Sequence, residues 1–329
     1  MKKFDYDPAS FSKTTYNIGG ISVHVYNSDT LAPYIESFNQ SLVHVDEIPI
    51  NVIYLIHARG RSYKDTEAIG YNILNQVNQK RNQQHKEAPL ICVTFDLRNH
   101  GERTIDAFKN EDWLKGNKTH GIDMVSSIMG NVQDLKLIID YLPDYLNLES
   151  YLTNEFKAKH QHYNIKHRNI ISGYSLGAHV VYRFANEYPD LVYAINPVVG
   201  CVDLTSLLIN RLKENDLSSE DYDKRWFYYN YDKLNLSPEQ QKIEYPEHFH
   251  KTLSKQDESI WENFAMHSIK MYASFGQEDR LVPYTLSSVW CDSYLNTNDD
   301  TQIVVYEGVG HDVTEKMVDD FTTWLVKQI

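Results

Sequence analysis

Short apolar segments rich in β-branched residues recur along the chain, and turn-forming residues bound most of them. Segments of this kind predict strands of a largely buried sheet. We expect eight strands, at Thr14–Ile18, Ile21–Tyr26, Val52–Ile56, Leu90–Phe95, Asn169–Ser172, Val192–Asn196, Ile269–Phe275 and Gln302–Tyr306. Only Gly19 and Gly20 separate the first two strands, and such a turn favours an antiparallel hairpin.

Between the later strands, apolar residues recur with the spacing of one helix face. The helices predicted in this way are Thr66–Arg81, Val132–Tyr141, Leu176–Tyr188 and Glu315–Lys327. Strands that alternate with helices predict an α/β fold with a mostly parallel sheet and helices on both faces. Reactive groups in such sheets collect at the carboxyl ends of the strands, so the residues that follow each strand are the first candidates for a functional site.

Two segments interrupt this alternation within what we expect to be a single domain, residues 1–329. Asp106–Gly130 is predicted to be a long loop. Asp203–Ser268 is rich in charged and aromatic residues, and we expect it to be mostly helical. It forms either a cap or lid over the sheet edge or a surface decoration.

Composition narrows the class of protein. The 329 residues carry a formal net charge of −13, and an acidic surface disfavours binding to nucleic acid. No run approaches the roughly 18 apolar residues of a membrane helix. Cys92, Cys201 and Cys291 lie far apart, and the chain starts without a signal-like apolar segment, so free thiols and a cytoplasmic location are expected.

The candidate nucleophile is Ser175. It lies in Gly173-Tyr174-Ser175-Leu176-Gly177, which matches G-x-S-x-G between a predicted strand and a predicted helix. In that context the pattern indicates a sharp turn that lifts the serine hydroxyl above the sheet. The same turn directs the N–H of Leu176 and the positive end of the helix towards the position where an oxyanion would form.

A serine nucleophile needs a base, and the base needs an acid that orients it. His311 follows the strand Gln302–Tyr306, and Asp279 follows Ile269–Phe275. Spacing alone does not separate Asp279 from its neighbour Glu278, and Asp312 is a more distant third candidate for the acid. The order Ser, Asp, His along the chain is that of α/β-hydrolases.

Several motifs at strand exits together resemble the α/β-hydrolase family, most closely its dienelactone-hydrolase and prolyl-oligopeptidase-like branch. The resemblance covers most of the chain from Thr14 onward, apart from the two insertions. The segments that carry it are His57-Ala58-Arg59-Gly60, Phe95-Asp96-Leu97-Arg98-Asn99-His100-Gly101-Glu102-Arg103, GYSLG, GQEDRLVP and GVGH.

This resemblance implies an eight-stranded α/β-hydrolase fold with a helical cap and places the catalytic acid at Asp279. It also implies a second oxyanion donor in the loop after the first parallel strand, either the N–H of Arg59 or that of Ala58. Relatives have glycine where this chain has Ala58, and alanine resists positive φ. The side chain of Arg59 binds a substrate carboxylate or faces solvent, and Tyr174 either lines the pocket or packs against the sheet.

These features predict a serine hydrolase that cleaves carboxylic esters or related acyl compounds through Ser175, His311 and Asp279. A thioesterase or a small-peptide hydrolase would use the same residues, and a ligand-binding protein on a hydrolase scaffold is a non-catalytic alternative. We expect a small-molecule partner, no organic cofactor and no bound metal, because no nucleotide-binding motif follows a strand and no histidine has other ligands at metal spacing.

Overall fold

In the computed structural model, which describes residues 4–81, 87–214 and 225–329, an eight-stranded sheet forms the centre of the protein. Its strands are β1 (Lys13–Ile18), β2 (Ile21–Tyr26), β3 (Glu47–Ile56), β4 (Leu90–Phe95), β5 (Asn164–Tyr174), β6 (Ala194–Val198), β7 (Lys270–Gly276) and β8 (Gln302–Tyr306). The spatial order is β1-β2-β4-β3-β5-β6-β7-β8. The β1–β2 and β2–β4 pairs are antiparallel, and all the other pairs are parallel. The eight predicted strands and the glycine hairpin are therefore confirmed.

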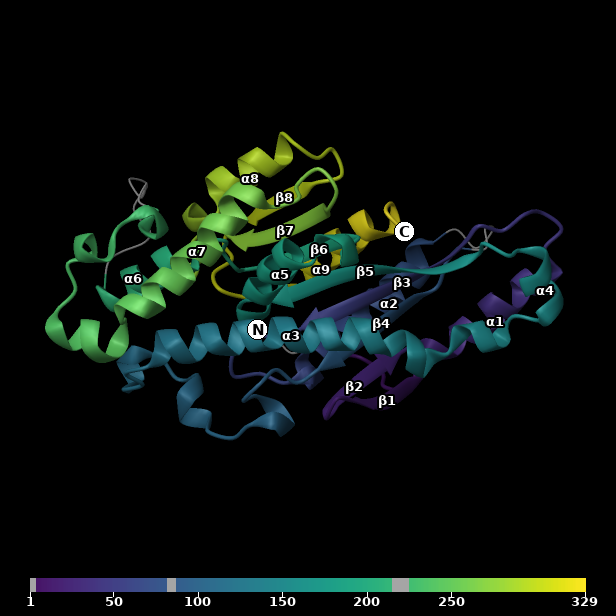
Figure 1. The fold of residues 1–329 in the computed structure, drawn as a ribbon, viewed down its shortest axis with the longest axis horizontal. Coiled ribbons are helices and arrows are strands. Elements are labelled where there is room, and N and C mark those ends of the chain that lie inside the picture. Colours follow the sequence, from purple (N-terminus) through teal and green to yellow (C-terminus); the bar gives the residue numbers. More distant parts are fainter. Residues whose placement is uncertain (1–3, 82–86, 215–224) are drawn as a thin grey trace.

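Helices cover both faces of the sheet. They are α1 (Leu31–Glu36), α2 (Tyr63–Lys80), α3 (His120–Leu146), α4 (Asn154–Lys159), α5 (Leu176–Glu187), α6 (Leu204–Leu212), α7 (Glu247–Asn263), α8 (Ser288–Leu295) and α9 (Glu315–Val326). Apolar side chains of α2 and α9 share one core layer with the sheet, and those of α3, α5 and α8 share the layer on the opposite face. Figure 1 shows α3 running along the near side of the sheet, with α6 and α7 gathered at one end.

The predicted strand β5 was too short at its start. We expected it to begin at Asn169, whereas it begins at Asn164 and pairs there with the first residues of β3, which itself begins at Glu47 and not at the predicted Val52. Its first half, Asn164–Arg168, is polar and partly exposed, because this end of the β3–β5 pair extends to the protein surface. An apolar run marks only the buried half of such a strand.

The predicted loop Asp106–Gly130 is wrong in its second half, because α3 begins at His120. The helix was missed there because glycines interrupt its first turns. Both have close neighbours: a Cβ on Gly121 would lie 3.1 Å from the Trp113 ring, and one on Gly130 would lie 2.7 Å from the Arg98 side chain. Tertiary packing thus favours glycine at positions where helix propensity disfavours it.

The segment Asp203–Ser268 contributes α6 and α7 together with short turns, and its residues 215–224 lie outside the described residues. Helix α7 packs against α5 and α6. An ion pair between Arg183 of α5 and Asp257 of α7 fixes this contact, with a 2.6 Å separation and both side chains almost fully buried. The insertion is therefore attached firmly to the body of the protein.

The three cysteines are free and buried, as expected. Within the described part of the chain, no helix is both long enough and apolar enough to cross a membrane.

Candidate active site

Ser175 occupies the sharp turn between β5 and α5. Its backbone has φ 53° and ψ −109°, a region that residues with a side chain rarely adopt. Two glycines make the turn possible. A Cβ on Gly173 would lie 2.3 Å from the carbonyl oxygen of Gly177, and one on Gly177 would lie 2.2 Å from the carbonyl oxygen of Ile56. This turn, the nucleophile elbow, is therefore packed directly against the end of β3.

A second strained residue lies beside this turn, at the end of β6. Val199 has φ 47°, which is unusual for a β-branched residue. The next residue, Gly200, approaches α5 so closely that a Cβ would lie 2.4 Å from the Cβ of Ala178. Residues held in unfavourable conformations cluster at functional sites, where the surrounding structure over-determines them.

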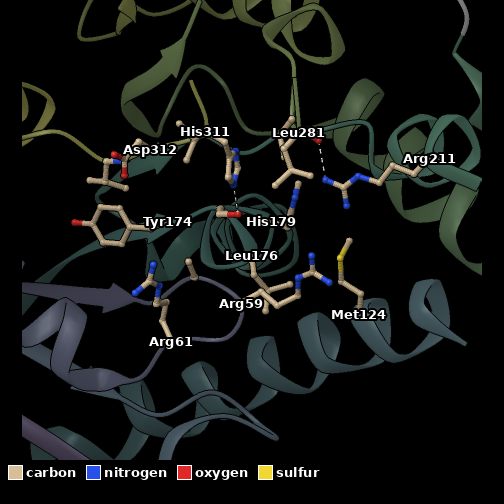
Figure 2. A pocket seen from close by; sticks show the side chains of 15 residues that line it. Arg59, Arg61, Met124, Tyr174, Leu176, His179, Arg211, Leu281, His311 and Asp312 are labelled. Carbon is tan, nitrogen blue, oxygen red and sulfur yellow. Dashed lines mark hydrogen bonds between the residues drawn. The ribbon is translucent and has the colours of Figure 1, made fainter. Parts of the chain in front are cut away.

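Ser175, His311 and Asp279 form a continuous hydrogen-bonded chain. Ser175 Oγ lies 2.8 Å from His311 Nε2, and His311 Nδ1 lies 2.7 Å from Asp279 Oδ2. The carboxylate accepts a hydrogen bond from Nδ1–H, which leaves Nε2 as the acceptor for the serine hydroxyl. In Figure 2 the imidazole of His311 points into the cavity, and a dashed line marks its hydrogen bond with Ser175.

The other carboxylate oxygen of Asp279 is also held. Oδ1 accepts hydrogen bonds from the backbone N–H groups of Leu281 and Val282, at 2.9 and 2.8 Å. The side chain of Asp279 is 1% exposed, so its orientation is fixed. Glu278 instead has an exposed side chain. Of the acids that spacing left open, Asp279 is held in a hydrogen bond with His311 Nδ1.

The predicted oxyanion donors lie where α5 begins and where β3 ends. Leu176 is the first residue of α5, so its N–H belongs to the group at a helix start that has no partner within the helix. In the loop after β3, the positive φ falls on Gly60, at 70°. Ala58 therefore needs no positive φ, and the departure from the family pattern at this residue causes no strain.

The side chain of His57 holds the loop after β3 in place through two hydrogen bonds. Its Nε2 accepts a hydrogen bond from the N–H of Leu97 at 3.0 Å, and its Nδ1 donates to the carbonyl oxygen of Ala58 at 2.8 Å. Burial lowers the pKa of His57 to about 4, so the ring is neutral at physiological pH, as these two bonds require.

A cavity of about 220 Å³ opens beside Ser175. Its walls come from the loop after β3, the start of α3, the elbow, the exit of β6, α6, and the loops after β7 and β8. The lining residues are Ala58, Arg59, Arg61, Met124, Tyr174, Ser175, Leu176, His179, Val199, Arg211, Leu281, Val282, His311, Asp312 and Val313. Ten of them are labelled in Figure 2.

Arg59 and Tyr174, the two candidate substrate-binding residues, both line this cavity. Arg59 is half-buried, and its guanidinium donates to the carbonyl oxygen of Asn110 at 3.0 Å, which holds the side chain at the cavity wall. Tyr174 is 1% exposed, and its hydroxyl lies 3.2 Å from Ser172 Oγ. It therefore both packs against the sheet and forms part of the cavity wall.

Three basic residues of this cavity, Arg61, His179 and Arg211, were not among the predicted site residues. His179 lies one turn after Ser175, where its Nδ1 contacts the carbonyl oxygen of Cys201 at 3.0 Å, and burial lowers its pKa to about 3. Arg211 comes from α6 in the insertion. No motif surrounds Arg211, and only the fold brings this part of the chain back to the serine.

Comparison with known proteins identifies the fold. No protein-family model matches the chain, and no curated protein is similar to it in sequence. Among solved structures, TT1662 from Thermus thermophilus is similar with a TM-score of 0.55 and 12% identity, over 97% of this chain and 98% of that one. Est1E from Butyrivibrio proteoclasticus, solved with ferulic acid bound, is similar with a TM-score of 0.50 and 12% identity, over 96% of this chain and 98% of that one. The chain has the α/β-hydrolase fold.

Proposed function

We propose that this α/β-hydrolase-fold protein is a serine hydrolase that cleaves small carboxylic esters through an acyl-enzyme. The observation that carries this proposal is the hydrogen-bonded chain Ser175–His311–Asp279 at the edge of a cavity. Its members follow the strands β5, β7 and β8 at one edge of the sheet and meet with the geometry that nucleophilic catalysis requires.

In this mechanism His311 Nε2 takes the proton of Ser175 as Oγ attacks the ester carbonyl. Asp279 holds the imidazole in the required tautomer and stabilises the imidazolium. His311 then gives the proton to the leaving alcohol as the C–O bond breaks, which leaves Ser175 acylated. A water molecule deprotonated by His311 attacks the acyl-enzyme and releases the carboxylic acid.

The tetrahedral intermediates carry a negative oxygen, which the N–H groups of Leu176 and Arg59 would bind. Each donor of this kind lowers the barrier by about 3 kcal/mol. Leu176 precedes Gly177 at the start of α5, and Arg59 lies in the loop that follows Ile56. The close contact between Gly177 and the carbonyl oxygen of Ile56 therefore fixes the position of one donor relative to the other.

The size of the cavity supports short acyl groups. About 220 Å³ is below the roughly 300–1,000 Å³ of pockets for drug-sized ligands. Because Arg211 of α6 forms part of the wall, we also propose that the insertion restricts access to Ser175. The rate with 4-nitrophenyl esters should therefore fall steeply between butyrate and decanoate, whereas equal rates across the series would contradict a closed cavity.

Thioesters and small peptides would be attacked by the same residues, and a ligand-binding protein without turnover is the alternative from another class. A panel of short esters, thioesters and peptide anilides, tested with the wild-type protein and with Ser175→Ala, separates these possibilities. We expect turnover of esters that Ser175→Ala abolishes. Turnover unchanged in Ser175→Ala, or absent for every ester, would contradict the proposal.

A further inference from the structure

The walls of the cavity have the opposite charge to the protein as a whole. The chain carries a formal net charge of −13, yet three arginines and a single acidic residue line the cavity. Figure 2 shows Arg59 and Arg211 on one side of the cavity, with Arg61 and Asp312 on the other. Arg61 also has a partner of its own, since it lies 3.8 Å from Asp65. A concentration of positive charge in an acidic protein needs an explanation.

Arg211 is held in place without neutralisation of its charge. One terminal nitrogen donates to the carbonyl oxygen of Leu281 at 2.7 Å. Its Nε is buried and has no hydrogen-bond partner within the described part of the chain. Burial, and next the charge of Arg59, lowers the pKa of Arg211 to about 10, so the group is still protonated at neutral pH.

The hydrogen-bond partners of Arg59 are likewise neutral, although the charges of Asp112 and Glu111 also act on it. Its guanidinium donates to the carbonyl oxygen of Asn110 and lies 3.4 Å from His120 Nδ1. That histidine nitrogen lies 2.9 Å from the carbonyl oxygen of Glu111, to which it donates. Burial, and next the charge of Arg59, lowers the pKa of His120 to about 4, so the ring is neutral.

Neither Arg59 nor Arg211 forms an ion pair with any carboxylate of residues 4–81, 87–214 or 225–329. Each uses a backbone carbonyl to fix the guanidinium, and the described residues supply no carboxylate within ion-pair distance of either. Unpaired charge in a partly buried site is costly unless an opposite charge is supplied. The two side chains come from separate elements, the loop after β3 and α6, so their convergence on one space is a property of the folded site.

We infer that Arg59 and Arg211 together bind an anionic group of the substrate, which makes the substrate a small carboxylic ester that carries a free carboxylate near the scissile bond. This inference rests on the proposed function, since it names the substrate class of the same site. Guanidinium groups match the planar, two-oxygen geometry of a carboxylate. Half-esters of short dicarboxylic acids have the required size and charge.

Paired substrates test this inference on the wild-type protein. The first pair places the charge on the acyl side. It compares the mono-4-methylumbelliferyl ester of adipic acid with the 4-methylumbelliferyl ester of hexanoic acid. The second pair places the charge on the alcohol side. It compares the acetate ester of 4-hydroxyphenylacetate with the acetate ester of 4-methylphenol. We expect kcat/KM to favour the charged member of at least one pair by about tenfold or more, through a lower KM. No preference in either pair would overturn the inference.

Variants then assign the preference to the two arginines. Arg211→Gln and Arg59→Gln should each lower the charged-to-neutral ratio of kcat/KM by about tenfold to a hundredfold, and Arg211→Lys should restore part of it. Lys136→Gln removes an exposed positive charge that pairs with Asp140 on α3, and it should leave the ratio unchanged. A ratio unchanged in both arginine variants would also overturn the inference.

The outcome separates this inference from the function on which it rests. Turnover of the neutral esters without a preference for the charged ones contradicts only the anion site. Absence of turnover for all four esters, with no reaction of Ser175 with a fluorophosphonate, contradicts the hydrolase itself.

Discussion

Gly177→Ala tests whether the elbow and the loop after β3 act as one rigid unit. The added Cβ would lie 2.2 Å from the carbonyl oxygen of Ile56, 2.8 Å from its carbonyl carbon and 3.0 Å from the carbonyl oxygen of His57. All three atoms belong to the backbone, so no flexible side chain can move aside. Helix α5 and the end of β3 must separate by about 1 Å to restore ordinary contact distances.

Two losses of different size should follow from this separation. Overpacking of this kind destabilises a protein by about 1–3 kcal/mol. A displacement of about 1 Å at reacting groups lowers the rate by about a hundredfold, since it moves Ser175 and the N–H of Leu176 away from the donor after β3. The protein should therefore remain folded but lose most of its activity.

Urea unfolding and kcat/KM for 4-nitrophenyl butyrate measure the two effects separately. Gly70→Ala is the matched control, because this glycine lies inside α2 and its Cβ would meet side chains alone, the flexible end of Leu55 at 3.0 Å and Cys92 at an ordinary contact distance of 3.5 Å. The control should change stability by less than about 1 kcal/mol and leave kcat/KM near the wild-type value. Wild-type activity in Gly177→Ala would refute the reasoning.

Three further predictions concern the acid of the site, the attachment of the insertion and a buried histidine. Asp279→Asn should lower kcat by about 10³–10⁴-fold, because His311 loses the acceptor that fixes its tautomer; a loss below tenfold in steady-state hydrolysis would contradict that role. Arg183→Met should cost about 3 kcal/mol or more in urea unfolding by leaving Asp257 buried and unpaired, whereas Lys251→Gln breaks an exposed pair on α7 and should cost under about 0.5 kcal/mol; equal costs would argue against the buried pair. Burial, and next the charge of Arg183, lowers the pKa of His179 from 6.5 to about 3, so below pH 6.5 the unfolded chain binds a proton that the folded protein does not, and stability falls as the pH falls. His179→Asn should therefore flatten the stability profile between pH 6 and 4 by up to about 1.4 kcal/mol per pH unit, and an unchanged slope in urea unfolding at several pH values would refute this.

The positions of the strands along the chain, and the exits that carry Ser175, Asp279 and His311, could be predicted from the sequence, because buried strands are continuous apolar runs and the candidate residues follow them directly. The choice between Glu278 and Asp279 could not be made from spacing. It depends on the turn in which the N–H groups of Leu281 and Val282 hold one carboxylate towards the histidine.

Features that depend on contacts between distant segments escaped prediction. The first turns of α3 were read as a loop, since local propensity counts Gly121 and Gly130 as breakers while packing favours them. No sequence feature indicated that Arg211 belongs to the site. In the sequence, an arginine within a segment rich in charged and aromatic residues resembles a surface residue. Only the fold brings Arg211 into the wall of the same cavity as Arg59.

The most direct test of the central claim is to treat the protein with a fluorophosphonate and locate the adduct by peptide mass spectrometry. The reagent phosphonylates a serine only when a neighbouring base activates its hydroxyl. We predict one adduct, on Ser175, that is absent in Ser175→Ala and forms far more slowly in His311→Ala. A folded wild-type protein that stays unlabelled, or one labelled at another serine, would contradict the assignment of Ser175 as the nucleophile.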